Sequence, residues 1–169
     1  NMKALSIRQP WAWAILCSGK RIENRARKDG RMPSICSYRG PLLIHASAGC
    51  TKREHGEASA WMVAKGLATW ELLHASLPYV PHLTLTPRGG IVGVCNVVAF
   101  IGPDGFLQGF ESPSGWDKAK NVDKRWHIAG SYGLVLADVR PLPFTPFKGA
   151  RGFFDVPDDI ALPLIGGDQ

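Results

Sequence analysis

A long apolar segment, Ile91 to Ile101, places the strongest constraint on how this chain can fold. Its residues are apolar at odd and even positions alike, so a strand built from them must bury both of its faces. Gly93 and Asn96 interrupt the segment, which is much too short to cross a membrane as a helix. We therefore predict a central strand, and the rest of the chain must supply neighbouring strands on both of its sides.

Shorter segments with the alternating pattern of strands lie before and after this central strand. They cover residues 3–7, 21–25, 41–46, 132–142 and 152–156. Helical spacing predicts helices at residues 11–18, 54–65 and 69–76, and residues 158–162 are expected to form a turn. Strands at both ends, with helices inserted between them, indicate an α+β fold whose small mixed sheet closes into a β-barrel.

Length and composition favour one domain without a targeting segment. With 169 residues, of which 45% are hydrophobic and 20% charged, the chain can bury a core of its own. We predict a single domain over residues 2–169, with a flexible surface insertion around residues 102–124, where Gly and Pro are frequent. The start of the sequence alternates polar and apolar residues, unlike a signal peptide, and this favours a cytoplasmic protein.

The cysteines and histidines do not predict a metal site. Cys36, His45, Cys50 and His55 have spacings unlike those of structural zinc sites. Because the sequence has no Cys-x-x-Cys pair and no export signal, the thiols are expected to be reduced. We expect neither a metal nor a cofactor, and the sequence does not indicate an oligomeric state.

Positive charge is concentrated in two segments of a chain whose net charge is +6. Residues 20–39 hold seven basic and two acidic side chains, and residues 118–127 hold four basic and one acidic. Charge segregated in this way produces a local potential that attracts phosphate groups, although two solvated basic loops would give the same count. A polyanionic partner is therefore predicted, with a plain solvated surface as the alternative.

Tryptophans accompany both basic segments. Trp11 and Trp13 precede the first segment, and Trp116 and Trp126 lie at the two ends of the second. Cations that hold phosphates and rings that stack on bases together suit a single-stranded nucleic acid. Packing in the core is the alternative for each ring, and one short helix cannot turn both Trp11 and Trp13 to the same side.

The start of the chain combines the beginning of a helix with a group of charged residues. Pro10 suits the first position of a helix, so free backbone N–H groups and the positive end of the helix dipole lie near Gln9 and Trp11. Such a helix end attracts anions. The strand that returns after Gly19 would lie beside this helix start. It carries three charged residues, Lys20, Glu23 and Arg25.

Several short motifs, in order along the chain, resemble those of a known family. They are Gln9-Pro10-Trp11, Gly19-Lys20-x-Ile22-Glu23-x-Arg25, Arg39-Gly40-x-Leu42-x-Ile44-His45-Ala46, Gly90-Ile91-Val92-Gly93, the stretch 126–132 and Lys148-Gly149-x-x-Gly152-Phe153-Phe154. The sequence is similar to the ASCH domain (activating signal cointegrator-1 homology), in the branch of bacterial and phage proteins that carries Gln-Pro-Trp. The resemblance extends over residues 2–156.

The resemblance implies a PUA-like fold, a small pseudo-barrel with two to four flanking helices and a cleft beside the first helix. The family is regarded as nucleic-acid binding, mostly of RNA, with DNA binding attributed to the cointegrator branch. Some members are enzymes, among them an amidohydrolase acting on acetylated cytidine and a ribonuclease. The family-typical cleft positions correspond here to Gln9, Trp11, Lys20, Glu23 and Arg25.

One departure from the family pattern bears on catalysis. The amidohydrolase branch uses a threonine nucleophile three positions after its lysine, where this chain has Glu23 after Lys20. A carboxylate cannot serve as the alkoxide nucleophile that the lysine would activate. The resemblance therefore does not extend to that activity, whereas hydrolysis of another kind remains open.

Each residue of the predicted cleft has a role in binding a nucleotide and a plainer alternative. Arg25 and Lys20 would hold phosphate oxygens, while Trp11 would stack on a base or pack in the core. Gln9 would pair with a base edge or cap the helix. Glu23 would accept a hydrogen bond from a base amine or act only as an ion-pair partner of the two cations.

Two further groups belong to the predicted binding surface. His45 follows an apolar strand and would either satisfy the end of that strand or act as a general base. Lys124, Arg125 and Trp126 would belong to a mobile flap that adds charge and an aromatic ring to the surface, or else to a disordered insertion.

The sequence therefore predicts an RNA-binding PUA-like module with a basic cleft, with single-stranded DNA or a nucleotide as other ligands. The alternative is a hydrolase, either a ribonuclease or a modified-nucleoside amidohydrolase, in which Lys20 and Glu23 are the general acid and base. A third class, a protein-interaction module, would need an exposed apolar patch around Trp61 and Met62.

Overall fold

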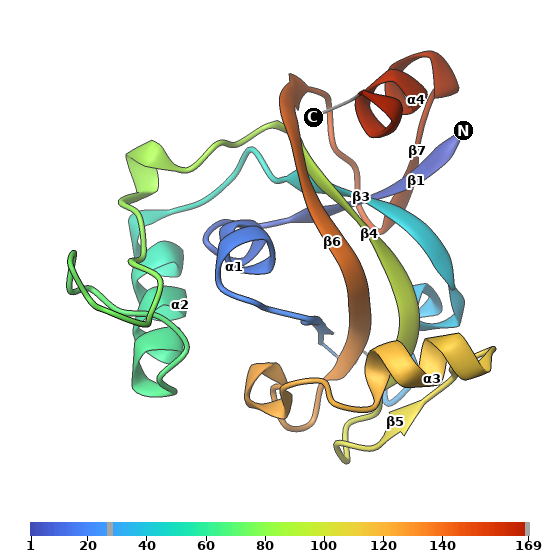
Figure 1. Cartoon of the computed structure of the whole chain (residues 1–169), viewed down its shortest axis with the longest axis horizontal. Helices are drawn as coiled ribbons and strands as arrows, with labels where there is room; N and C mark the ends of the chain where they lie inside the picture. Colours follow the sequence, from blue (N-terminus) through green and yellow to red (C-terminus); the bar gives the residue numbers. More distant parts are fainter. Residues whose placement is uncertain (27–28, 168–169) are drawn as a thin grey trace.

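The computed structural model describes residues 1–26 and 29–167, and its organising element is one curved sheet of seven strands (Figure 1). The strands are β1 (Met2–Ile7), β2 (Ile22–Arg25), β3 (Gly40–Ala46), β4 (Gly90–Ile101), β5 (Leu107–Gln108), β6 (Tyr132–Pro146) and β7 (Phe153–Val156). Their order is β2-β6-β4-β3-β1-β7, and β5 pairs with one end of β4. The prediction for β4 is confirmed, because β3 and β6 pair with its two sides and most of its residues are buried.

The α+β class is confirmed, but the sheet does not close into a barrel, so that part of the prediction is wrong. Within the described residues, the edge strands β2 and β7 form no hydrogen-bonded pairing with each other. Each of these strands has only four residues, which gives little length for closing a sheet. Bulges between β4 and β6 bend the long central pair, and β1 runs across in a different direction (Figure 1).

Four α-helices surround the sheet in the described part of the chain. They are α1 (Trp11–Cys17), α2 (Lys52–Ala64), α3 (Pro113–Ala119) and α4 (Asp158–Gly166), and three short 3-10 helices are η1 (Ser34–Ser37), η2 (Leu83–Leu85) and η3 (Lys124–Trp126). The predictions for 11–18 and 54–65 are confirmed by α1 and α2. Helix α2 begins at a capping box in which Thr51 and Glu54 each bond the other's backbone N–H.

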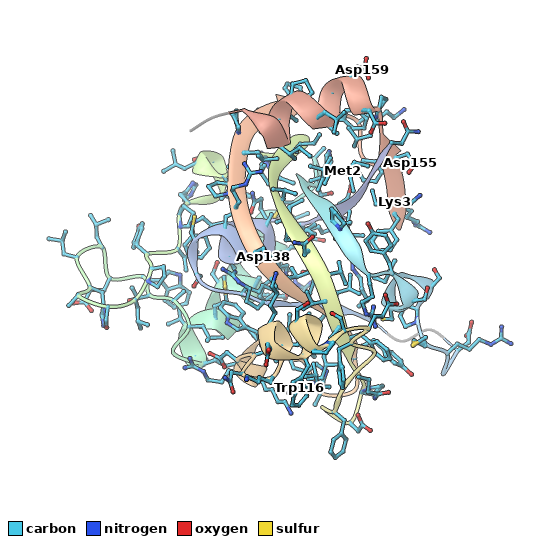
Figure 2. All side chains as sticks on the ribbon, turned by 45° about the vertical axis from the view of Figure 1, so that its right-hand side comes forward. Met2, Lys3, Trp116, Asp138, Asp155 and Asp159 are labelled. Atoms are coloured by element: carbon cyan, nitrogen blue, oxygen red, sulfur yellow. The ribbon has the colours of Figure 1, made fainter. Side chains whose placement is uncertain are left out.

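The predicted helix at residues 69–76 is wrong. The chain forms a loop there that stands away from the rest of the molecule in both whole-chain views (Figures 1 and 2). Two hydrogen bonds of 2.9 Å join the ends of this loop. Thr69 N–H donates to the carbonyl oxygen of Pro78, and Val80 N–H donates to the carbonyl oxygen of Thr69. Leu73 in this loop is 91% exposed, so its side chain does not pack against the rest of the protein. A short helix needs such packing of its apolar face to be stable.

Two other segments are more regular than the sequence predicts. The insertion at 102–124 contains β5 and α3, and α3 begins where Ser112 caps Gly115 N–H and Pro113 takes the first helical position. The expected turn at 158–162 is the first half of α4, which continues to Gly166 and buries Ala161. In both segments the helix is short and buries only one or two small residues, a pattern that periodicity alone does not reveal.

Helix α1 is held between the sheet and α2. Ala12 and Ile15 belong to the cluster formed with the sheet, whereas Ala14 belongs to a second cluster that includes Met62 of α2. Met62 is fully buried, so α2 does not present the apolar patch that the protein-interaction hypothesis requires. This packing fixes the start of α1 beside β1, β2 and β3.

Candidate functional site

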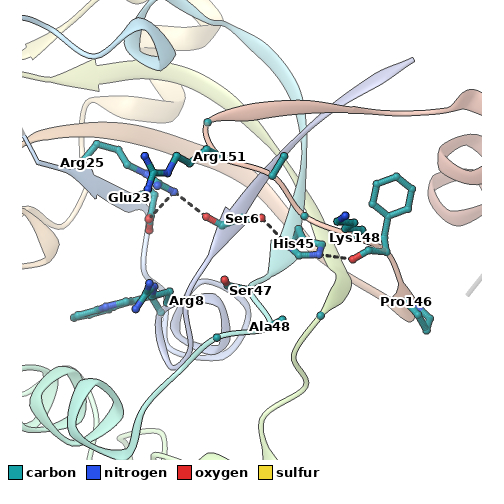
Figure 3. Close-up of a pocket in the computed structure, with 17 residues that line it drawn as sticks. Ser6, Arg8, Glu23, Arg25, His45, Ser47, Ala48, Pro146, Lys148 and Arg151 are labelled. Carbon is teal, nitrogen blue, oxygen red and sulfur yellow. Dashed lines mark hydrogen bonds and ion pairs between the residues drawn. The ribbon is translucent and has the colours of Figure 1, made fainter.

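A pocket of about 1050 Å³ lies beside the start of α1 (Figure 3). Its walls come from several separate segments, namely Ser6 of β1, Arg8, Trp11 of α1, Glu23 and Arg25 of β2, His45 of β3, residues 47–49, Gly89 and residues 146–152. The last segment connects β6 to β7 and passes along one side of the pocket (Figure 3). Residues from distant parts of the sequence therefore meet here because β1 pairs with both β3 and β7.

Four basic side chains line this pocket, together with a single carboxylate, that of Glu23. The basic residues are Arg8, Arg25, Lys148 and Arg151. Two of them already have acidic partners, because Arg8 pairs with Glu54 of α2 and Arg25 pairs with Glu23. Among the described residues, Lys148 and Arg151 have no carboxylate within 4.0 Å. We call this cavity the basic pocket, and its excess of cations makes it attractive to anions.

A buried ion pair lies behind the wall of the basic pocket. Lys20 is 2% exposed, and its Nζ pairs with Glu23 Oε2, while Glu23 Oε1 lies 3.3 Å from Arg25 Nη2. Burial lowers the pKa of the Lys20 ammonium below its usual value of 10.5, and the Glu23 carboxylate offsets part of that shift. Glu23 therefore links a buried cation to a cation that faces the cavity.

Local structure explains how these three charges come together. Gly19 follows α1 with a φ of 73°, a left-handed conformation that lets the chain reverse directly into β2. Glu23 and Arg25 are two residues apart in β2, so both point to the same side of the strand and both line the pocket. The structure thus brings together Lys20, Glu23 and Arg25.

Trp11 forms part of the wall of the basic pocket and is only partly buried. Its ring meets the ring of Trp61 edge to face, with centroids 5.6 Å apart, and Lys20 Nζ lies 5.5 Å from the Trp11 centroid. The side chain is therefore fixed on one side by α2 and open to the cavity on another. Trp11 therefore lies beside Lys20, Glu23 and Arg25 and is not fully buried in the core.

His45 is almost fully buried at the base of the pocket, where a bulge between Ile44 and His45 shifts the register of β3 with β4. Its Nδ1 lies 2.9 Å from Ser6 Oγ, and its Nε2 lies 2.8 Å from the carbonyl oxygen of Phe147. Both ring nitrogens thus have protein partners, as expected for a histidine that ends a strand. The contact with the Ser6 hydroxyl also suits a general base, so this second role predicted for His45 stays a prediction.

Gln9 does not reach the basic pocket. The residue is 2% exposed, its Nε2 donates to the carbonyl of Pro87 at 2.9 Å, and its Oε1 accepts from Trp13 N–H at 2.9 Å. Because donor and acceptor are both occupied, the side chain satisfies the first turn of α1 and is not available to a base. Of the two roles predicted for Gln9, the structure therefore favours the capping role.

The second basic segment lies away from the pocket, since Lys124, Arg125 and Trp126 do not line it. Trp126 is 1% exposed and packs with Ile22 of β2, so its ring cannot stack on a ligand. Acidic neighbours pair with three of the four basic side chains of this segment, and Lys124 has no such partner among the described residues. The pairs are Lys118–Asp138, Lys120–Asp117 and Arg125–Asp123 (Asp138 is labelled in Figure 2). These pairs neutralise much of the positive charge that the sequence places in this segment.

Sequence reasoning missed four residues of the site, namely Ser6, Arg8, Lys148 and Arg151. Ser6 and Arg8 stand immediately before Gln9, within the stretch that carried the N-terminal prediction. Lys148 belongs to a motif that supported the family resemblance, so it was a usable signal. Its place in the pocket depends on β7 pairing with β1, which no local pattern predicts.

Other possible kinds of site receive no support from the residues that the structure describes. Among them, no group of three or more His, Cys, Asp or Glu side chains is arranged to hold a metal ion. In the same part of the chain, none of the helices has the length and apolar character needed to cross a bilayer. The four cysteines are free thiols.

Comparisons with known proteins identify the family. The model of the ASCH domain matches residues 5–133, well over half of the chain. The fold is similar to a crystal structure of ASCH from Zymomonas mobilis, with 13% identity, a TM-score of 0.46, and 98% of this chain and 94% of that chain covered. A mutant of the Zymomonas mobilis protein gives 12% identity, the same TM-score, and 98% and 97% coverage. No curated protein matches significantly. From the extent of the match to the family model, this chain belongs to the ASCH domain family.

Proposed function

We propose that the basic pocket binds single-stranded RNA, holding phosphate groups and one base. The observation that carries this proposal is the convergence of four cations and one partly exposed tryptophan on a single cavity with only one carboxylate. Family membership agrees with it, because ASCH domains have a PUA-like fold that is often linked to RNA binding. Single-stranded DNA and free nucleotides share the phosphate and the base, and therefore they are competitors in the test.

The cations of the pocket divide into two kinds. Lys148 and Arg151 are exposed and have no acidic partner in the described part of the chain, so each can neutralise a phosphate of the ligand. Arg25 is held in place by Glu23 and by the Ser6 carbonyl, which accepts from its Nη2 at 3.1 Å. An arginine oriented in this way loses little side-chain entropy when it binds a phosphate oxygen.

Trp11 supplies the surface for the base. Because Trp61 fixes the indole ring at an edge-to-face contact, the ring need not be ordered when a ligand arrives. Stacking of one base on such a ring contributes about 1–3 kcal/mol and tolerates any base. The pocket is therefore expected to prefer single strands, whose bases are free to stack, and to show weak sequence preference.

The salt dependence of RNA binding tests the proposal. Binding of a fluorescent ten-nucleotide RNA would be followed by anisotropy over a series of salt concentrations, using wild type and single variants. Arg151→Ala should weaken binding and reduce the slope of log K against log salt by about 0.7, the value for one phosphate contact on a single strand. Lys124→Ala is the matched control, because it removes another exposed cation that lies outside the pocket.

Two results would contradict the proposal. One is a wild-type affinity that does not change with salt, which would show that phosphates are not the main contact. The other is an equal effect of Lys124→Ala and Arg151→Ala, which would mean that net charge and not the pocket attracts the RNA. Trp11→Ala distinguishes the base contact, since it should weaken binding while leaving the salt slope unchanged.

The buried Lys20 favours a second candidate function, hydrolysis of a nucleic acid or modified nucleoside. Its lowered pKa makes proton transfer to Glu23 easier, and Glu23 faces the cavity. Turnover of RNA and of acylated nucleosides by wild type and Lys20→Met tests this mechanism. Methionine keeps the volume of the side chain, and an unchanged turnover number in that variant would exclude Lys20 from the chemistry.

A further inference from the structure

Ser6 and His45 lie beside each other on β1 and β3, whose parallel pairing places the two residues in register. Ser6 Oγ is 2.9 Å from His45 Nδ1, and His45 Nε2 is 2.8 Å from the carbonyl oxygen of Phe147. A carbonyl oxygen only accepts, so Nε2 carries a proton and donates it to Phe147. In the neutral imidazole Nδ1 is then the acceptor for the Ser6 hydroxyl.

This arrangement contains the three parts that activate a serine. Ser6 provides a hydroxyl, His45 provides a base within hydrogen-bond distance, and the Phe147 carbonyl holds the imidazole in the required tautomer. His45 is almost fully buried, whereas Ser6 is partly exposed and lines the basic pocket. The hydroxyl is thus the member of the pair that a ligand in the cavity can reach.

The chain passes very close to this pair at Gly149. A Cβ atom at that position would lie 2.4 Å from Ser6 Oγ and 2.6 Å from His45 Cε1. Only glycine fits without displacing one of these groups, so backbone and not a side chain lies next to the hydroxyl. The approach to Ser6 from the cavity is consequently not blocked by a side chain of residue 149.

A positive charge is held beside the serine. Arg25 Nη2 donates to the main-chain carbonyl of Ser6 at 3.1 Å, and Glu23 fixes the same guanidinium from the other side. Figure 3 shows the resulting run of interactions from Glu23 through Arg25 and Ser6 to His45, and the hydrogen bond from His45 Nε2 to the Phe147 carbonyl oxygen continues it. A cation in this place can stabilise negative charge that develops on an oxygen near Ser6 Oγ.

We propose that Ser6 is a nucleophile with His45 as its general base, and that the basic pocket hydrolyses carboxylic esters formed on the ribose of a nucleotide. The proposal rests on the nucleotide binding proposed above, because the cations would hold the phosphate while the ester carbonyl meets Ser6. A serine and a histidine suit this chemistry, since one proton moves from the nucleophile to the leaving oxygen.

The reaction has two halves. Ser6 Oγ attacks the ester carbonyl carbon while its proton passes to His45 Nδ1, and the negative oxygen of the tetrahedral intermediate faces Arg25. The bond from carbon to the ribose oxygen then breaks, and that oxygen takes the proton from His45, which leaves an acyl-Ser6. In the second half, a water molecule gives a proton to His45 and attacks the acyl carbon. The bond from this carbon to the Ser6 oxygen then breaks, the Ser6 oxygen takes the proton from His45, and the carboxylic acid is released.

The probes are AMP carrying an acetyl ester on its ribose and the matching acetylated adenosine without phosphate. Release of acetate by the full chain would be measured at low salt, with buffer alone as the reference. We expect acetyl-AMP to be hydrolysed well above the buffer rate and at least tenfold faster than acetyl-adenosine. Ser6→Ala should lower the rate by about 100-fold or more, whereas Ser37→Ala, an exposed serine of η1 outside the pocket, should not change it.

A covalent label provides an independent readout. An aryl fluorophosphonate reacts with activated serines, and mass spectrometry should locate it on Ser6 and not on Ser47, which also lines the pocket. Binding of AMP to Ser6→Ala should stay within threefold of wild type, a result that also shows that the variant is folded. Ser6→Cys adds a second test of the nucleophile, because a thiol at this position should be alkylated faster than the native Cys17.

Specific results would overturn the inference. They are acetate release from acetyl-AMP at the buffer rate, equal rates for Ser6→Ala and wild type, and a label on Ser47. If AMP still binds in these cases, the inference fails and the proposed function stands. If neither AMP nor the RNA binds at low salt, the proposed function fails and the inference fails with it.

Discussion

Removing the charge of Glu23 should strongly destabilise this fold. Glu23→Gln keeps the shape of the side chain but leaves the Lys20 ammonium, which is 2% exposed, without its carboxylate. Breaking a buried ion pair by neutralising one partner costs about 3–5 kcal/mol, because the remaining charge is neither solvated nor paired. Arg25 also loses a partner, but with 30% of its side chain exposed it can be solvated. Lys20 therefore accounts for most of the expected loss.

Urea unfolding measures this effect, with the free energy of unfolding extrapolated to zero denaturant. The denaturant slope should be unchanged, since the substitution alters charge and not the extent of the folded structure. Glu57→Gln is the matched control, because Glu57 pairs with Arg53 on the surface of α2, with 64% and 87% of these side chains exposed. An exposed helical pair of this kind contributes little, and the control should stay within about 0.5 kcal/mol of wild type.

The double variant Lys20→Met, Glu23→Gln identifies the cause of the loss. Replacing both partners removes the unpaired charge, and apolar replacements of buried pairs are often neutral or stabilising by about 1–4 kcal/mol. The double variant should thus recover most of the stability lost in Glu23→Gln. A loss below about 1 kcal/mol in the single variant, or a double variant no more stable than it, would refute this account of a buried, mutually dependent pair.

Three further predictions follow from burial and packing. Because burial lowers the pKa of Lys20, the unfolded chain binds the proton of this side chain more tightly than the folded chain does. The free energy of unfolding should therefore rise with pH between the lowered pKa and about 10.5, and Lys20→Met should remove that rise. Trp126→Ala should cost about 3–5 kcal/mol in urea unfolding, while the RNA affinity of the folded variant stays as in wild type, and a weaker affinity at an unchanged salt slope would show that the ring faces the ligand after all. Gly149→Ala should cost about 1–3 kcal/mol, because the added methyl meets Ser6 and His45, and an unchanged unfolding midpoint would contradict so close an approach.

The sequence predicted those parts of the fold and site that are fixed by neighbours along the chain. The two-sided apolar pattern of β4 specified a central strand because apolar side chains at odd and even positions alike require burial of both faces. Likewise, Lys20, Glu23 and Arg25 lie within six residues directly after the turn at Gly19, so a helix followed by a strand was enough to place them together. Local geometry alone was sufficient in both cases.

The errors come from interactions between distant segments. Closure of the sheet depends on whether two four-residue edge strands can meet, which is a property of overall curvature and not of either strand. The positive charge of 118–127 is reduced because Asp138, which follows in β6, pairs with Lys118. Trp126 packs in the same buried cluster as Ile22, so its ring is not on the surface. Charge counted along a sequence therefore overestimates the surface potential wherever folding supplies a carboxylate.

The same principle explains why the basic pocket keeps its charge. Its single carboxylate, that of Glu23, is shared with the buried Lys20, so it cannot fully neutralise Arg25. Lys148 and Arg151 come from the connection between β6 and β7, where no acidic side chain stands within 4.0 Å of them in the described part of the chain. If the basic pocket binds RNA as proposed, a ligand phosphate is the partner that the fold itself does not provide, and the binding energy should depend most on Lys148 and Arg151. Arg25, held on two sides before the ligand arrives, would contribute orientation more than affinity.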